Sequence, residues 1–385
     1  MSQQTPNIVR ARGVYRANSA LYFPPGSQFS FTYVFPDQEV TVRAGTYTVK
    51  GPHGPISNGI WTSGEAQGDN LQDTELTFRN LVDDAVGMFS FLTNAATEEP
   101  TLEILYNLDV ESTTHEAIFS SFTAHYSTPP TVLREPPKFM GKGIKSLGDH
   151  EFKERLWRGI SSYVTALRNW RIGHEVVAFS FLYMAMEALT RVAREPLFDK
   201  FGGAKGLADE WKIDIKKVDP EVRRRILFKG DDELYKSAKT ASDSMEHGFG
   251  ELQDIVDVAE RQVVKLAYLV REFIVFQLFG EGARSALLLS DAYNRPLTCV
   301  PARASLIGTL SGNREGIAHP NQHPDMSFKL EPTHMAKEQG ADWRIQWDTT
   351  VPVPALAPGV MFQKGEVHLK EVNISGPHIE DVTQP

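Results

Sequence analysis

The amino-acid sequence predicts an α+β protein in which an all-α helical bundle lies between two β-rich regions. Three observations carry this prediction. Apolar and polar residues alternate through much of residues 1–135, apolar residues recur at helical spacing through residues 148–282, and alternation returns within residues 293–385. A period of two is typical of strands with one buried face, whereas a period near 3.6 is typical of amphipathic helices. A chain of 385 residues also exceeds what one hydrophobic core usually serves, so we expect these three segments to be separate domains.

The N-terminal region, residues 1–135, contains several alternating segments. Residues 29–35 place an aromatic side chain at every second position. Residues 39–43 and 46–50 alternate in the same way on either side of Ala44-Gly45, which predicts a β-hairpin. One helix is expected over residues 80–95, followed by a strand over residues 102–108.

A domain boundary is predicted after this region. Proline pairs occupy positions 129–130 and 136–137, and a run with two glycines follows at positions 138–143. Proline fixes its own φ and disfavours helical geometry in the residue before it. These residues are therefore expected to link the first region to the second.

The middle region, residues 148–282, predicts four helices. The first carries one apolar stripe, which comprises Phe152, Leu156, Ile160, Tyr163, Val164 and Leu167. The second, residues 173–194, is apolar nearly all round, which predicts a central position, and Glu195-Pro196 and Gly202-Gly203 are expected to end it. Residues 220–241 predict one or two shorter helices, and a long last helix precedes Gly280. Short connections between the helices favour an antiparallel bundle.

The C-terminal region, residues 293–385, is rich in proline and glycine and contains further strands. Residues 343–347 and 366–370 alternate between apolar and polar side chains. This region either forms its own domain or packs with the N-terminal region as one β unit that the bundle interrupts. The pattern leaves both possibilities open.

Composition excludes several classes of protein. The net charge of −9 gives no global basic field, so any contact with RNA requires a local basic patch. The single cysteine, Cys299, excludes an internal disulfide framework. The first residues lack the apolar segment of a secretory signal, and no apolar run approaches the roughly 20 residues of a membrane span. We therefore expect a cytoplasmic protein without a membrane partner.

No motif indicates a cofactor or a metal. The sequence has no Gly-rich phosphate loop, no nucleophile elbow and no His-Glu-x-x-His. His319, His323 and His334 lie near one another, with Asp325 and Glu331, but their spacing matches no usual pattern of metal ligands. We expect these to be ordinary loop histidines.

The most informative segment is residues 239–248, Lys-Thr-Ala-Ser-Asp-Ser-Met-Glu-His-Gly. The sequence predicts a polar turn here, followed at once by the long last helix. Backbone N–H groups at a helix start have no internal partner, and the helix dipole favours anions there. His247 in that position could donate to a phosphate or move a proton near neutral pH.

The middle region resembles the HEPN superfamily (higher eukaryote and prokaryote nucleotide-binding), and specifically its Apea-like branch. Three features carry the resemblance: a basic, aromatic first helix at residues 157–158 and 168–170, an apolar second helix with an embedded Glu-Ala-Leu at residues 187–189, and Glu-His-Gly at residues 246–248. The Ser-Asp-x-x-Glu-His-Gly form has a weaker resemblance to methylamine utilization protein MauJ. The HEPN resemblance implies a helical bundle that forms a homodimer.

The resemblance also implies a ribonuclease motif, namely an arginine followed after four to six residues by a histidine. In metal-independent RNA cleavage the histidine moves protons and the arginine holds the phosphate. His247 fits the histidine, but the positions that should offer the arginine are not basic, and Lys239 lies one step too far. Asp243 and Glu246 would repel an anion, which argues against ribonuclease activity.

Two other pairs satisfy the motif by spacing alone. Arg168 precedes His174 by five intervening residues, although this pair joins the first two predicted helices. Arg314 precedes His319 by four, but Pro320 follows and no helix is expected. Arg171 is a further basic residue that folding could bring near His247.

The preferred interpretation of His247 is structural, with the imidazole hydrogen-bonding the turn or the helix start. Two sets of residues are candidates for binding. In the alternative interpretation of His247, Glu187, Ser242, Asp243 and Glu246 form a ligand or partner pocket beside it. Arg223 and Arg224 belong to the one concentrated basic run, which is either a local RNA patch or a solvated helix face.

Three functions are expected from the residues and the two resemblances. The preferred one is a non-catalytic or weakly catalytic module that binds RNA, a nucleotide or a protein partner, for which the HEPN resemblance implies a role in prokaryotic defence, stress or an accessory function. The second is a metal-independent endoribonuclease that uses His247. The third is a maturation or assembly factor related to methylamine utilization.

Overall fold

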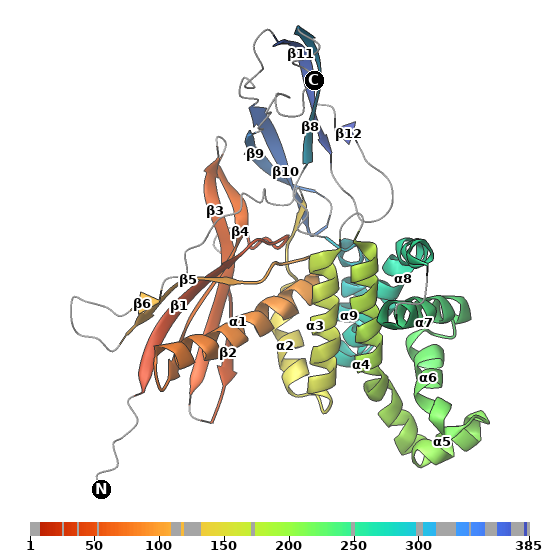
Figure 1. Ribbon diagram of the computed structural model, residues 1–385. Helices are drawn as coiled ribbons and strands as arrows, with labels where there is room; N and C mark the ends of the chain where they lie inside the picture. Colours follow the sequence, from red (N-terminus) through yellow and green to blue (C-terminus); the bar gives the residue numbers. More distant parts are fainter. Residues whose placement is uncertain are drawn as a thin grey trace.

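The protein contains both helices and sheets, as the sequence predicts. The computed structural model describes residues 8–24, 27–36, 38–51, 54–108, 117–118, 132–170, 174–247, 251–297, 303–312, 329–338, 340–350, 360–370 and 381–382. A six-stranded sheet lies beside a helical bundle, and two smaller sheets lie at one end of the molecule (Figure 1).

The larger sheet is antiparallel throughout, with the order β2-β3-β4-β1-β5-β6. Its strands are β1 (Val9–Ala17), β2 (Phe29–Val34), β3 (Glu39–Gly51), β4 (Gly54–Gly68), β5 (Thr101–Asn107) and β6 (Ala117–Ile118). The expected strands over residues 29–35 and 102–108 are therefore confirmed as β2 and β5.

The predicted hairpin around Gly45 is wrong, because β3 runs through this position as one strand. Gly45 pairs with Trp61 of β4, and a Cβ at Gly45 would lie only 2.7 Å from the Trp61 ring. The glycine therefore leaves space for an indole that covers the strand, and the chain does not turn there.

Helix α1 (Leu71–Thr93) covers one face of this sheet, which we call the inner face. It begins earlier than the predicted residue 80, because Asn70 caps it by accepting a hydrogen bond from the Asp73 N–H at 2.9 Å. Its buried residues pack with Val40 and Val42 of β3 in one hydrophobic cluster.

The bundle has more helices than predicted. Its α-helices are α2 (Met140–Gly148), α3 (Lys153–Asn169), α4 (Glu175–Phe201), α5 (Gly203–Trp211), α6 (Val218–Val222), α7 (Asp232–His247), α8 (Leu252–Phe279), α9 (Ala283–Leu288) and α10 (Asp291–Asn294). A 3₁₀ turn, η1 (Ile215–Lys217), precedes α6, and a π-helix, η2 (Arg223–Leu227), follows it.

Two predicted boundaries in the bundle are wrong. Helix α2 occupies part of the expected linker, with Met140 and Leu147 buried. Helix α4 continues through the exposed Pro196, so Glu195-Pro196 does not end it. It ends at the other predicted stop, Gly202, whose φ of 74° is the left-handed conformation that glycine adopts readily at a helix end. The long last helix is confirmed as α8.

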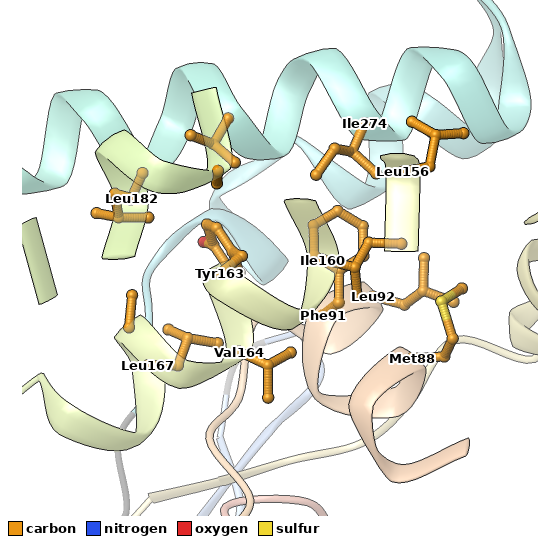
Figure 2. Close-up of a cluster of buried hydrophobic side chains, with 14 of the residues drawn as sticks. Met88, Phe91, Leu92, Leu156, Ile160, Tyr163, Val164, Leu167, Leu182 and Ile274 are labelled. Atoms are coloured by element: carbon orange, nitrogen blue, oxygen red, sulfur yellow. The ribbon is translucent and has the colours of Figure 1, made fainter. Parts of the chain in front are cut away.

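One hydrophobic core joins the sheet to the bundle. Figure 2 shows side chains of α1, α3, α4 and α8 packed together, among them Phe91, Ile160, Tyr163 and Ile274. The core thus crosses the boundary expected near residue 136, because α1 packs on the sheet and on the bundle.

The C-terminal strands form two small sheets. One has the order β7-β10-β9, from β7 (Val132–Arg134), β10 (Asp342–Thr350) and β9 (Lys329–Lys337). The other has the order β12-β11-β8, from β12 (Asp381–Val382), β11 (Val360–Lys370) and β8 (Arg303–Gly312). The strands expected at residues 343–347 and 366–370 are confirmed, and β7 brings a strand from the N-terminal region into a sheet with β10 and β9.

A buried arginine fixes the junction of these parts. Arg134 of β7 is fully buried, and its guanidinium donates to both carboxylate oxygens of Asp342 in β10 at 2.7 and 3.1 Å. It also donates to the carbonyl oxygens of Thr93, at the end of α1, and Arg295. One side chain therefore links α1, β10 and the segment after α10.

Helix α4 is long and apolar enough to cross a membrane by length and composition alone. More than half of its apolar window is buried inside the protein, and the core helix of a folded domain passes the same test.

Candidate functional site

The structure places His247 at the end of a helix and not at the start of one. Helix α7 runs continuously from Asp232 to His247, and α8 begins only at Leu252. The predicted turn over residues 239–247 is therefore wrong. The buried residues Leu234, Ala238 and Ala241 lie four and three apart, which gives α7 an apolar stripe that extends into this segment. At a helix C-terminus the dipole disfavours anions, so this position lacks the anion-attracting character expected for His247.

The other residues of the predicted signature lie along the same helix. Lys239 and Asp243 form an i,i+4 ion pair on α7, and Ser242 is buried. The carboxylate of Asp243 thus balances Lys239, one of the cations that could replace the missing arginine. The side chains of Glu246 and His247 lie outside the described part of the structure.

The alternative arginine–histidine pairs are only partly described. Arg168, in the last turn of α3, donates from Nε to the carbonyl oxygen of Thr97 at 2.7 Å, whereas α7 packs against α4 and α8. His174 is exposed directly before α4. Other predicted residues, namely Arg171, Cys299, Arg314, His319 and His323, lie outside the described residues. Within the described part of the chain, no three His, Cys, Asp or Glu side chains could hold a metal ion.

The predicted basic run is neutralised by neighbouring carboxylates. Arg223 in the π-helix donates to Glu187 of α4 at 2.8 Å. Arg224 pairs with Glu221 at 2.8 Å and with Asp232 at 2.5 Å. A π-helix is rare and often marks a functional position, but the arginines of this one form ion pairs with α4 and with the first residue of α7. Glu187 and Arg223 are brought together as partners, not as a basic patch.

A basic surface that the sequence analysis missed lies on the outer face of the larger sheet. Arg10, Arg12 and Arg16 occupy alternate positions of β1, and their neighbours Ala11, Gly13, Tyr15 and Ala17 are buried. Because side chains alternate across a strand, the three arginines share the face opposite α1. Arg43 is exposed on β3, in the same cross-strand row as Ser63 of β4.

Aromatic rings accompany these arginines. The Arg16 guanidinium carbon lies 3.5 Å from the centre of the Tyr47 ring, which is stacking distance. Trp61 stands directly between Arg16 of β1 and Gly45 of β3 in the strand register. Both aromatic side chains are partly exposed. The outer face therefore offers two flat rings beside a cation.

A polar groove of about 290 Å³ crosses this face, lined by residues that include Arg12, Arg43, Thr41 and Ser63. Two guanidinium groups and two hydroxyls are donors suited to a phosphate group. Glu39 and Glu65 also line the groove, so it holds two carboxylates beside its two guanidinium groups. Glu65 accepts a hydrogen bond from Arg12 Nε at 3.0 Å and lies 3.7 Å from the Arg10 guanidinium. This contact fixes the orientation of the Arg12 guanidinium. We define the outer arginine face as Arg10, Arg12, Arg16, Arg43, Tyr47 and Trp61.

The sequence contains a signal for this face. Within residues 9–17, arginine recurs at positions 10, 12 and 16 while small or apolar residues occupy positions 11, 13, 15 and 17. The period of two in this segment predicts that the three arginines share one face of a strand. The sequence does not predict that Trp61 and Arg43 lie beside them, because that depends on the order of strands in the sheet.

No family model matches this chain, and comparisons with curated proteins and with solved structures found no match. Its function is therefore inferred from the geometry of its own residues.

Proposed function

We propose that this protein is a non-catalytic, HEPN-like RNA-binding protein that contacts single-stranded RNA through the outer arginine face. The observation that carries the proposal is the juxtaposition of Arg12 and Arg43 around a polar groove with Trp61 and Tyr47 on the same sheet face. The resemblance of the bundle to HEPN proteins supports a cytoplasmic role in prokaryotic defence, stress or an accessory function.

The chemistry of the face favours single-stranded RNA over a duplex. Bases of a single strand can be splayed out and stacked on aromatic rings, and a sheet presents such rings in one plane. Arginines beside the rings neutralise phosphates. A local cluster of this kind is what a chain with a net charge of −9 needs to bind RNA.

A catalytic role has less support. A ribonuclease site needs a cation to hold the phosphate beside the histidine. Lys239 is paired with Asp243, and the backbone of His247 ends a helix instead of starting one. We therefore propose binding without cleavage.

Replacing Arg12 and Arg43 together by glutamine is expected to weaken binding of an unstructured single-stranded RNA at least tenfold. Each lost phosphate contact should also reduce the dependence of log affinity on log salt by roughly 0.7 for a single strand. Trp61→Ala should make the binding free energy less favourable by about 1–3 kcal/mol. It should leave the slope of log affinity against log salt unchanged, because base stacking releases no counterions. Fluorescence anisotropy of a labelled RNA over a salt series measures both quantities.

Two controls accompany this experiment. Arg191→Gln changes an arginine on α4 that pairs with Glu195 far from the sheet, and it should leave RNA binding unchanged. His247→Ala should also bind normally. Unchanged affinity in the Arg12/Arg43 variant would refute the proposal, and RNA cleavage that His247→Ala abolishes would establish the ribonuclease function in its place.

We further propose that the protein forms a homodimer through the bundle, as the HEPN resemblance implies. Support comes from an apolar stripe on α4, where Val177 and Met184 are exposed and Phe181 is partly exposed between them. A second copy that covers this stripe would remove it from water.

Met184→Glu is therefore expected to convert the dimer into a monomer. Met184 is 51% exposed, so the substitution should not disturb the core. Sedimentation velocity measures the change, with Lys200→Glu on the same helix as the control. A wild-type protein that is monomeric at high concentration would contradict this prediction.

A further inference from the structure

A cavity of about 340 Å³ lies where the larger sheet meets the bundle. Its walls come from four separate elements: Tyr33 of β2, Asp84 and Met88 of α1, Leu147 of α2, and Glu154 and Trp157 of α3. Cavities of this size typically hold small ligands, and apolar walls with a few polar groups are their usual composition.

Two aromatic side chains are held firmly in its wall. The Tyr33 hydroxyl donates to the carbonyl oxygen of Leu81 at 3.3 Å. The Trp157 indole lies against α1 at Gly87, where an added Cβ would be 3.0 Å from the ring. The glycine allows the indole to approach the helix closely. Both rings therefore line the cavity in fixed positions.

The cavity wall carries two carboxylates, Asp84 and Glu154, and one ammonium group, Lys153. Among the described residues, none donates a hydrogen bond to the Asp84 carboxylate. Burial, Asp83 and Glu154 all act in the same direction and raise the pKa of Asp84 to about 6. Lys153 lines the cavity as well, and within the described part of the chain it forms no ion pair with Asp84.

We propose that this cavity binds a small organic ammonium ion, with its positive nitrogen beside Asp84 and Glu154 and its carbon groups against Tyr33 and Trp157. Aromatic faces attract ammonium groups, and a desolvated cation gains more than an exposed one. An opposite charge beside a buried carboxylate stabilises the ionised form. Anions are excluded by the same carboxylates.

Binding should depend on pH with a definite sign. A proton on Asp84 competes with the ligand, so affinity should fall as the pH decreases through about 6. The other ionisable groups that face this carboxyl are Asp83 on α1, Tyr33 on β2, and Lys153 and Glu154 on α3.

Isothermal titration calorimetry of the full chain tests the proposal with three probes. Choline supplies a quaternary ammonium, n-butylammonium supplies a primary one, and 3,3-dimethylbutan-1-ol is the uncharged analogue of choline. We expect saturable binding of at least one ammonium probe and no binding of the alcohol. Asp84→Asn should lower the affinity at least tenfold and remove the pH dependence, and Trp157→Leu should weaken binding through the lost ring.

The control is Asp199→Asn, which removes an exposed carboxylate from α4 and should bind like the wild type. Preference for the quaternary or the primary probe identifies which kind of ammonium the cavity takes. Failure of both ammonium probes to bind, equal binding of the alcohol, or unchanged affinity in a folded Asp84→Asn variant would each overturn the proposal. RNA binding by the outer arginine face is tested independently of this result.

Discussion

Asp342→Ala is expected to lower the free energy of unfolding by about 3–5 kcal/mol, because it leaves the buried Arg134 guanidinium without a counter-ion. Arg134 is 0% exposed, so water cannot replace the lost carboxylate. The remaining partners are carbonyl oxygens, including those of Thr93 and Arg295, and these carry no full charge to balance the cation.

Urea denaturation followed by circular dichroism measures this loss. Glu338→Ala is the matched control, since Glu338 pairs with Arg344 nearby while both side chains are more than a third exposed. An exposed pair typically contributes about 0–1 kcal/mol, so the control should remain close to the wild type. If both variants lost equally little, Arg134 would not act as the electrostatic junction of α1 and β10.

The loss of stability in Asp342→Ala should be largest where the N- and C-terminal regions contact each other. Arg134 lies on β7, which pairs with β10 across more than 200 positions of sequence in the register Arg134↔Asp342. Hydrogen exchange of β10 amides should therefore increase more than that of the buried helix α8 in the Asp342→Ala variant. This follows because regions open in cooperative units that depend on their own contacts.

The parts of the fold that the sequence predicted correctly are those with long, regular periodicity. Helix α8 carries its apolar residues at helical spacing over its whole length and begins at Leu252, after the glycines of the preceding segment. The alternation in β2, β10 and β11 likewise identified strands. Local patterns of this kind depend on one element and its buried face, so they are visible without knowing the fold.

The errors arose where a distant partner decides the conformation. The sequence suggested that Gly45 is a turn residue. The position is glycine because the Trp61 ring of the neighbouring strand leaves no space for a side chain there. The segment that ends at His247 looked like a turn because it is polar, yet the stripe of α7 that packs on α4 and α8 keeps it helical. Neither partner could be identified from the local residues.

The candidate sites show the same division. The alternating arginines of β1 were visible in the sequence, whereas their position beside Trp61 depends on β4 lying between β1 and β3. The cavity at Asp84 combines side chains from four elements, none of which carries a recognisable motif. Sites assembled in this way are found only when the tertiary structure is known.

Asp84→Asn is expected to stabilise the protein near neutral pH. In the wild type the pKa of this carboxyl is raised from 3.8 to about 6, so the folded state binds more protons than the unfolded state between these two values. Stability from this group is therefore present below about pH 4 and is lost as the pH rises through 6. The amide carries no charge and avoids this loss, which we place at about 1–2 kcal/mol after allowing for screening by solvent.

The difference in unfolding free energy between Asp84→Asn and the wild type should thus grow from acid to neutral pH and then level off. Glu221→Gln is a control of opposite sign, because Arg224 and Arg225 lower the pKa of Glu221 and its removal should cost stability only above the acid range. A pH-independent difference for Asp84→Asn would show that its carboxyl titrates normally. A variant that is more stable yet no longer binds an ammonium ion would mean that Asp84 is retained at the expense of stability, as residues of a binding site commonly are.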